Sequence, residues 1–333
     1  MPLVPMTDLL AWAKRDGYAV PAFDLINMEW LQAFVKAAED KRSPLILAIA
    51  QVHFPWVNIE LISPMIHKIV SQASIPVAVH LDHGVDLNAV VRALQCGFTS
   101  IMFDASDKPL EENVAIVRKV VEMCHSAGIS VEAELGHVGG EEGGIVGHAA
   151  EERFFTDPRE AREFVERTGV DALAVSIGNV HGAYRGEPRL DFERLTQLRD
   201  ATGIPLVLHG GSGLSPEDYR RAVSLGIHKI NIYADLSNAA TKAVWELLRP
   251  AEGREKFTMV SQAAREGVYA EACRKIDLFG SADRCRHPSA LCDLCGGCEV
   301  GGGRRGGDET LVRTVTEAVM RLLREAPGGS ARS

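Results

Sequence analysis

The chain alternates short, continuously apolar runs with longer amphipathic segments, and this alternation recurs along most of its length. Eight of the runs have the length and β-branched content of strands: Tyr18–Phe23, Pro44–Ala50, Pro76–Leu81, Ser100–Phe103, Ser130–Ala133, Ala172–Ser176, Pro205–Leu208 and Lys229–Ile232. Apolar strands separated by helices are typical of a parallel sheet that is covered on both faces. The pattern therefore predicts an α/β fold with eight parallel strands.

Helices are expected between the strands because the intervening segments repeat apolar residues with helical periodicity. They are predicted at Trp30–Asp40, Leu61–Ala73, Leu87–Gln95, Leu110–Ala127, Pro158–Arg167, Asp191–Ala201, Pro216–Leu225 and Leu236–Leu248. Eight such units fit either an open, doubly wound sheet or a closed (β/α)8 TIM barrel.

Polar residues placed just after the strands separate these two architectures. Asp24 follows the first strand, Asp82 and His83 follow the third, and His181 and His209 come after the sixth and seventh. In a barrel these positions converge on one C-terminal mouth, where active sites of this fold lie, whereas an open sheet spreads them along a line. We therefore predict a TIM barrel with a site at its mouth.

The composition changes near the end of the barrel pattern. Residues 1–282 carry the strand and helix pattern, and residues 283–333 form a Cys/Gly-rich tail. Its stretch Gly296–Gly307 is too rich in glycine to pack a core, whereas Glu309–Arg324 has the periodicity of one amphipathic helix. We expect a barrel domain followed by an extension that ends in a helix.

The overall charge and the N-terminal sequence exclude several classes of partner. A net charge of -9 gives no general affinity for nucleic acid or for an anionic membrane. The segment Met1–Asp8 lacks the basic region of a signal peptide, and no apolar run reaches the roughly 18 residues that span a bilayer. A cytoplasmic protein with a small-molecule ligand is the expectation.

Three histidines, His83, His181 and His209, end three different strand units. Neutral imidazoles suit Zn²⁺, and three protein ligands leave a coordination position open for a substrate oxygen. The alternative is three unrelated histidines that are each satisfied by hydrogen bonds. Their equivalent positions in one barrel favour a catalytic metal site.

The neighbours of these histidines suit substrate chemistry. Asp82 directly precedes His83, so its carboxylate can move protons beside the metal, or alternatively orient the histidine. Gly182 and the run Gly210-Gly211-Ser212-Gly213 allow backbone amides to approach a phosphate closely. Because the protein as a whole is acidic, such a phosphate has to be bound locally.

Several motifs then resemble one enzyme family. They are His80-Leu81-Asp82-His83-Gly84, Glu132-Ala133-Glu134-Leu135-Gly136, Gly178-Asn179-Val180-His181-Gly182-Ala183-Tyr184, Leu208-His209-Gly210-Gly211-Ser212-Gly213 and Lys229-Ile230-Asn231-Ile232. In this order and spacing they are similar to the motifs of class II, zinc-dependent fructose-bisphosphate and tagatose-bisphosphate aldolases. The resemblance covers roughly residues 1–282, and the family is usually dimeric or tetrameric.

The resemblance implies a role for each matching residue. It implies that His83, His181 and His209 bind zinc, that Glu134 joins them in some states, and that Asp82 handles the proton of the aldehyde-side hydroxyl. Glu142 matches a glutamate on a mobile loop that moves the proton at the nucleophilic carbon. The dihydroxyacetone phosphate half would be bound by Gly182, Gly211, Ser212 and Asn231, with a monovalent cation (Na⁺ or K⁺) beside its phosphate.

The chain also departs from the family pattern. Asp24 stands where these aldolases usually have Asn, which places a further carboxylate near the substrate. Tyr233-Ala234-Asp235 replaces a segment that usually supplies a threonine hydroxyl to the phosphate, and Arg185 replaces a frequent lysine. These changes leave the aldolase class intact and bear on which substrate is used.

The tail carries a second candidate metal site. Cys285, Cys292, Cys295 and Cys298 have the close spacing of zinc or iron–sulfur ligands. The alternative is a linker with incidental cysteines, because the surrounding glycines provide no scaffold.

The predicted function is reversible aldol cleavage of a ketose phosphate or bisphosphate to dihydroxyacetone phosphate and an aldehyde. Fructose 1,6-bisphosphate is the first candidate substrate, and tagatose 1,6-bisphosphate or another sugar or sugar-acid phosphate is the alternative. A non-catalytic barrel that binds sugar phosphates is a third reading, which the presence of Asp82 and Glu142 beside the histidines disfavours.

Overall fold

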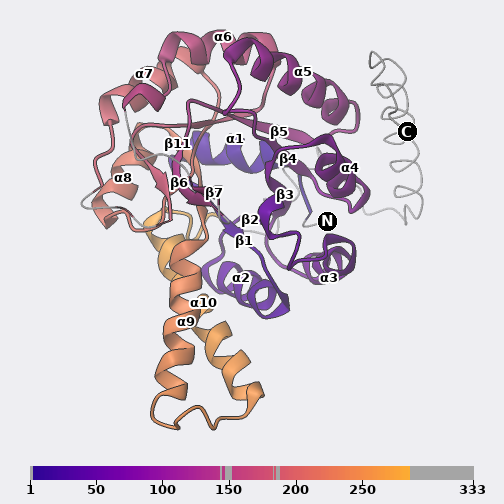
Figure 1. Cartoon of the computed structure of the whole chain (residues 1–333), viewed down its shortest axis with the longest axis vertical. Coiled ribbons are helices and arrows are strands. Elements are labelled where there is room, and N and C mark those ends of the chain that lie inside the picture. Colours follow the sequence, from indigo (N-terminus) through magenta and orange to yellow (C-terminus); the bar gives the residue numbers. More distant parts are fainter. Residues whose placement is uncertain (1–2, 143–144, 147–151, 183, 185–187, 286–333) are drawn as a thin grey trace.

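The computed structural model describes residues 3–142, 145–146, 152–182, 184 and 188–285, and eight parallel strands close into a barrel (Figure 1). In spatial order the strands are β1 (Val20–Asp24), β11 (Ile227–Ile232), β10 (Leu206–Leu208), β8 (Ala172–Val175), β5 (Ser130–Leu135), β4 (Ser100–Phe103), β3 (Val77–Gly84) and β2 (Leu45–Ala50). The barrel closes where β1 pairs in parallel with β11. The predicted (β/α)8 fold is confirmed, with all eight strands at the expected places.

Helices surround the barrel and follow its strands in sequence. They are α2 (Met28–Lys41), α3 (Ile59–Val70), α4 (Leu87–Gln95), α5 (Leu110–Ser126), α6 (Pro158–Thr168), α7 (Phe192–Thr202), α8 (Pro216–Leu225) and α9 (Ala234–Leu248). Side-chain caps fix several starts: Asn27, Asp86 and Asp157 each accept a backbone N–H in the first turn of the helix that follows. Two further helices, α1 (Met6–Asp16) and α10 (Phe257–Leu278), were not expected from the sequence.

The barrel interior is apolar at the end where the strands begin. Inward-facing residues such as Val20, Ile46 and Met102 form one buried cluster with Met6 and Leu9 of α1. Figure 1 shows α1 lying behind the ring of strands, across its centre. α1 is therefore a plug that closes the lower end of the barrel.

A second, larger apolar cluster fills the space between the strands and the outer helices. It takes the alternate strand residues, for example Val77, Val79 and Leu81 of β3, together with buried helix residues such as Phe34 and Phe164. Since successive strand residues point to opposite faces, the residues between these, Ala78, His80 and Asp82, face the barrel interior. This alternation decides which polar side chains reach the centre of the barrel.

Shorter elements lie over the mouth, and a helical arm extends from one side. β6 (Gly139–Glu142) pairs with β7 (Ile145–Val146) and with β9 (Val180–His181), and two short 3-10 turns cover Gln51–His53 and Glu152–Phe154. The helices α9 and α10 form a hairpin that projects away from the barrel (Figure 1). Trp245 and Phe257 near its tip are 61% and 80% exposed. Among the described helices, none combines the length and the apolar content that a bilayer crossing requires.

Candidate active site

The polar residues predicted at the strand ends meet at the C-terminal mouth of the barrel. Asp24 ends β1, Asp82 lies near the end of β3, Glu134 near the end of β5 and Asn231 near the end of β11. All four are buried, with exposed fractions between 0% and 6%. The alternation along each strand turns these side chains inward, so four strands supply one polar layer above the apolar plug.

His83 reaches the same layer by a different route. It is one residue after the inward-facing Asp82, so a regular strand would turn its side chain outward. The pairing of β3 with β4 is irregular between Leu81 and Gly84, and His83 has a positive φ of 43°. This left-handed conformation is unfavourable for a residue with a Cβ, by roughly 1–2 kcal/mol. The strained backbone turns the imidazole into the mouth of the barrel.

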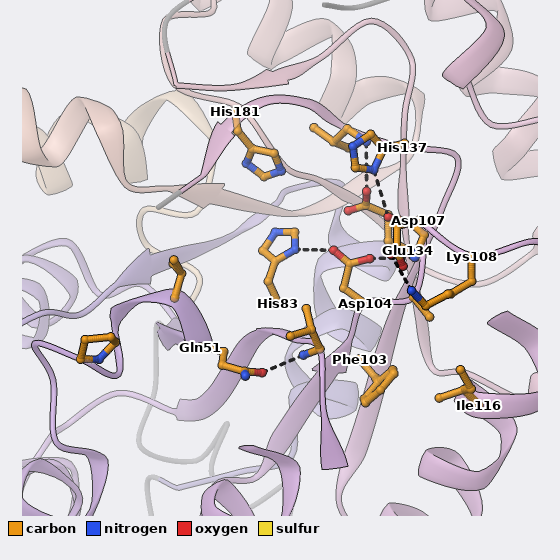
Figure 2. Close-up of a pocket in the computed structure, with 16 residues that line it drawn as sticks. Gln51, His83, Phe103, Asp104, Asp107, Lys108, Ile116, Glu134, His137 and His181 are labelled. Carbon is orange, nitrogen blue, oxygen red and sulfur yellow. Dashed lines mark hydrogen bonds and ion pairs between the residues drawn. The ribbon is translucent and has the colours of Figure 1, made fainter. Parts of the chain in front are cut away.

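Four side chains at the mouth form one group suited to holding a metal ion. They are His83, Glu134, His181 and His209, whose ligand atoms all lie within 4.8 Å of one another. The ring centroid of His83 lies 5.0 Å from that of His181 and 4.6 Å from that of His209. Figure 2 shows His83 and His181 facing each other across the cavity, with Glu134 nearby. Within the described part of the chain, no second group of this kind occurs.

The hydrogen bonds around two of these histidines fit a bound cation. His83 Nδ1 lies 2.8 Å from a carboxylate oxygen of Asp104, and His209 Nε2 lies 2.9 Å from Glu132. Because carboxylates accept, these nitrogens carry the hydrogens, and the opposite nitrogens carry lone pairs. Those two nitrogens, His83 Nε2 and His209 Nδ1, face each other at 2.9 Å. Burial holds the pKa of His209 well below its ordinary value. Two neutral imidazoles with converging lone pairs are the donor set that a metal such as Zn²⁺ prefers.

A buried ion pair beneath the metal-ligand group was not expected from the sequence. Glu132, which holds His209, also accepts a hydrogen bond from Lys229 Nζ at 2.7 Å. Lys229 Nζ lies 3.2 Å from His80 Nε2, and His80 Nδ1 lies 2.7 Å from Ser100 Oγ. All four side chains are fully buried. Their inward positions on β5, β11, β3 and β4 follow from strand alternation, but their pairing across the barrel does not.

The two carboxylate oxygens of Asp82 differ in their hydrogen bonding. Its Oδ1 accepts a hydrogen bond from Asn231 Nδ2 at 2.9 Å. Its Oδ2 is buried and has no hydrogen-bond partner within the described part of the chain. A buried carboxylate oxygen is costly to leave unpaired, so Asp82 is arranged to receive a hydrogen from a bound molecule.

Residues Gly210–Gly213, which we call the glycine loop, join β10 to α8 beside this group. Gly210 and Gly213 have positive φ angles of 60° and 86°, and a Cβ on Gly210 would collide with the carbonyl of Val180. Only glycine tolerates both conditions. The loop leads to a capping box at Ser215 and to the start of α8. Backbone N–H groups before a helix start form a natural anion site.

A cavity of about 740 Å³ opens from the metal-ligand group toward solvent. His83, Glu134 and His181 line its inner end, and Lys108 lies among its outer residues (Figure 2). The ammonium of Lys108 lies 2.7 Å from Asp107. The volume suits a small polar metabolite.

Some predicted residues lie wholly or partly outside the described part of the chain. Glu142 belongs to β6 by its backbone, but its side chain is not among the described residues, and neither are Arg185, Cys292, Cys295 and Cys298. Gly182 follows β9 with a positive φ of 76°. Cys285 is described: its N–H donates to Arg42 O, and burial raises the pKa of its thiol to about 12. The tail metal site therefore stays a prediction.

Comparison with known proteins gives a consistent result. A family model described as fructose-bisphosphate aldolase class-II matches residues 4–284. The fructose-bisphosphate aldolase of Geobacillus stearothermophilus is 43% identical over 287 residues, which cover 85% of this chain and 99% of the relative. The fructose-bisphosphate aldolase of Staphylococcus aureus (strain Mu50) is 40% identical over 291 residues, 86% of this chain and 100% of the relative.

A solved structure is similar over the same region. The YdjI aldolase from Escherichia coli K12 superimposes with a TM-score of 0.76 at 37% sequence identity, covering 85% of this chain and 99% of that one. The matched region contains every element of the barrel and the whole metal-ligand group. The chain therefore belongs to the class II fructose-bisphosphate aldolase family, and it is an aldolase, a carbon–carbon lyase.

Proposed function

We propose that this aldolase cleaves fructose 1,6-bisphosphate reversibly to dihydroxyacetone phosphate and glyceraldehyde 3-phosphate. One observation carries the proposal: the metal-ligand group, the carboxylate of Asp82 with one unpaired oxygen, and the glycine loop lie together at one barrel mouth. Family relatives named fructose-bisphosphate aldolase support the choice of sugar. Class II aldolases in general are zinc-dependent and act on sugar phosphates.

Zinc is the proposed metal, and His83, His181 and His209 are its proposed ligands, with Glu134 as a fourth group in some states. When bound, Zn²⁺ supplies Lewis-acid stabilisation of the negative charge that aldol cleavage builds on the ketose oxygens. Asp104 and Glu132 orient His83 and His209 for this role, since each accepts the hydrogen of the other ring nitrogen.

Asp82 and Glu142 are the proposed proton carriers. Asp82 Oδ2 takes the proton from the hydroxyl on the aldehyde side during cleavage and returns it during condensation, while Asn231 fixes the other carboxylate oxygen. Glu142 moves the proton at the carbon of dihydroxyacetone phosphate that attacks the aldehyde. The segment around Glu142 is rich in glycine, which suits a lid that closes over the substrate.

The phosphate of the dihydroxyacetone half is assigned to the glycine loop and its surroundings. Its proposed contacts are Gly182, Gly210, Gly211, Ser212, Asn231 and Arg185, with a monovalent cation beside them. Asp24 borders the remaining part of the substrate and is the residue most relevant to sugar choice. Because this carboxylate replaces the usual Asn, tagatose 1,6-bisphosphate or another sugar phosphate is the alternative substrate.

The assembly and the tail complete the proposal. The exposed Trp245 and Phe257 on the α9–α10 hairpin support a homodimer or homotetramer, because large apolar side chains at a projecting tip favour burial against another subunit. We place the enzyme in the cytoplasm. Residues 1–282 form the catalytic barrel, and residues 283–333 form a separate extension whose cysteines bind a second metal.

The test is a coupled assay that detects triose phosphate release from fructose 1,6-bisphosphate, with tagatose 1,6-bisphosphate run in parallel. Exhaustive chelation should abolish cleavage, and Zn²⁺ should restore it. Full activity in a preparation shown by elemental analysis to lack metal would sink the zinc assignment. Preference for the tagatose sugar would transfer the proposal to the alternative substrate, and absence of cleavage with every sugar phosphate would favour a binding protein.

A further inference from the structure

Lys275 is a buried lysine near the end of α10, and its contacts lead to the glycine loop. Its side chain is 1% exposed. The ammonium donates to the hydroxyl of Tyr219 at 2.7 Å and to a carboxylate oxygen of Asp235, and it lies 3.7 Å from a carboxylate oxygen of Glu271. A buried ammonium persists only where polar or anionic partners compensate for the water it has lost. The two hydrogen-bonded partners, Tyr219 and Asp235, therefore indicate the role of the lysine.

Both partners of Lys275 hold the glycine loop. The hydroxyl of Tyr219 donates to the carbonyl oxygen of Gly211. The carboxylate of Asp235 accepts the N–H of Gly213 at 3.2 Å, and the N–H of Asp235 donates to Ser212 Oγ at 3.3 Å. Three consecutive loop residues are thus fixed through the partners of one lysine. Ser212 Oγ accepts in this contact, so its own hydrogen remains to donate to a ligand.

Lys275 also compensates the negative charge of Asp235 beside the glycine loop. Asp235 lies against the loop that is assigned to an anionic phosphate, and an uncompensated carboxylate there would repel it. The ammonium of Lys275 contacts the same carboxylate oxygen that accepts from Gly213. Burial lowers the pKa of Lys275, and the carboxylate of Asp235 opposes that shift. The Lys275–Asp235 pair carries no net charge, and the neighbouring Glu271 forms its own ion pair with Arg274.

We propose that Lys275 is a positioning residue for the phosphate half of the substrate. It fixes the glycine loop through Tyr219 and Asp235, and it cancels the negative charge that Asp235 brings to the loop. The identity of the ligand rests on the proposed function, whereas the contacts within the network do not. The final helix of the barrel domain thereby contributes to substrate binding without touching the substrate.

The test replaces Lys275 with methionine, which keeps the length of the side chain and removes its charge and hydrogen bonds. Two quantities are measured on the zinc-loaded enzyme: the Kd of inorganic phosphate by calorimetric titration, and the KM of dihydroxyacetone phosphate in the condensation direction. Both should rise about 10-fold or more, because two buried partners lose their donor. The kcat should fall less than about threefold, and the zinc content should stay unchanged.

Matched variants separate this role from general support of the fold. Lys41→Met removes another lysine–aspartate pair onto α10, the exposed 2.6 Å contact with Asp277, and should change neither quantity by more than about twofold. Lys275→Met combined with Asp235→Asn should recover much of the phosphate affinity, because the uncompensated charge is gone. A Kd and KM within twofold of the wild type in Lys275→Met would overturn the proposal.

A milder variant covers the case in which Lys275→Met does not fold. Tyr219→Phe keeps the ring and loses the contact with Gly211, so it should raise the phosphate Kd several-fold, and an unchanged Kd would contradict the inference. Failure of the proposed function is distinguishable from failure of this inference. An unaltered protein that cleaves no ketose phosphate would refute the function, while the phosphate titration would still decide the role of Lys275.

Discussion

The two ends of the barrel interior are built from the same alternating strand positions but hold opposite contents. At the lower end, Val20 and Ile46 pack against α1 in a dry apolar cluster. At the mouth, the corresponding inward positions hold Asp82, Glu134 and other groups that prefer water. Burying an ionisable side chain costs several kcal/mol, whereas burying a large apolar one stabilises by about 1.5–3 kcal/mol. The plug therefore supplies stability that offsets the cost of burying polar groups at the mouth.

Asp82→Asn should have the largest effect, which is a loss of activity without a loss of stability. The amide cannot accept a proton, so we expect kcat for cleavage to fall by about 10²–10⁴-fold. The free energy of unfolding should stay the same or rise, because a buried charged oxygen without a described partner is replaced by a neutral group. Steady-state kinetics and urea unfolding measure the two effects. Loss of zinc from the variant would instead assign Asp82 to orienting the metal-ligand group.

Leu9→Ala tests the other end of the barrel. Leu9 is fully buried in the plug, so its truncation should lower the free energy of unfolding by about 2–5 kcal/mol. The kcat and KM of the folded enzyme should remain within about twofold, since the plug lies apart from the mouth. Ala11→Ser, at an exposed position of the same helix, is the control and should cost about 0.5 kcal/mol or less. A large loss of kcat in Leu9→Ala would show that the two ends are not independent.

His228→Gln should have the smallest effect, confined to acid. Burial, followed by the charge of Lys14 in α1, lowers the pKa of His228 from 6.5 to about 4. The unfolded chain therefore binds this proton more readily than the folded one, and stability is lost as pH falls from about 6.5 to about 4. The loss is on the order of 2 kcal/mol, present in the wild type and absent in the variant. Urea unfolding of both proteins across this pH range measures the difference. If the free energy of unfolding depends on pH equally in both, His228 does not cause the loss of stability in acid.

Much of the fold is predictable from the sequence, because burial dictates the residue types along each strand. The eight strands were predicted within a few residues, because a strand buried on both faces has to be apolar throughout. The convergence of polar side chains at the mouth follows from the same pattern, because the polar exceptions, such as Asp82 and His209, fall at strand ends where a barrel brings them together. Both predictions rest on patterns that one short segment carries by itself.

The features that the sequence does not predict depend on contacts between residues far apart in the chain. α1 precedes the first strand and packs against the barrel floor, so no strand–helix rhythm indicates it. α10 buries Val268, Ala272 and Ile276 along one line, while residues 257–267, in the projecting arm, are exposed or partly exposed. The pairing of Glu132 with Lys229 joins residues from strands far apart in the chain. A single sequence does not show which of its residues come together in space.

His83 shows a different limit. Its identity as a candidate metal ligand was predicted from its place after a strand, but the alternation rule alone would have turned it away from the site. The structure brings it in through a positive φ and an irregular pairing with β4. Backbone strain of this kind is maintained by surrounding structure, and a local sequence pattern does not reveal it.

The closure of the barrel between β1 and β11 has a consequence for synthesis of the chain. Val20 pairs with Lys229, so the first strand made is among the last to obtain both of its neighbours. At about 5–20 residues per second, a ribosome needs roughly 10–40 s to deliver β11 after β1 has emerged. During this interval one edge of β1 has no partner from its own barrel, and α1 has no complete floor to dock on. One edge of β1 therefore stays unpaired in the nascent chain until β11 has been made.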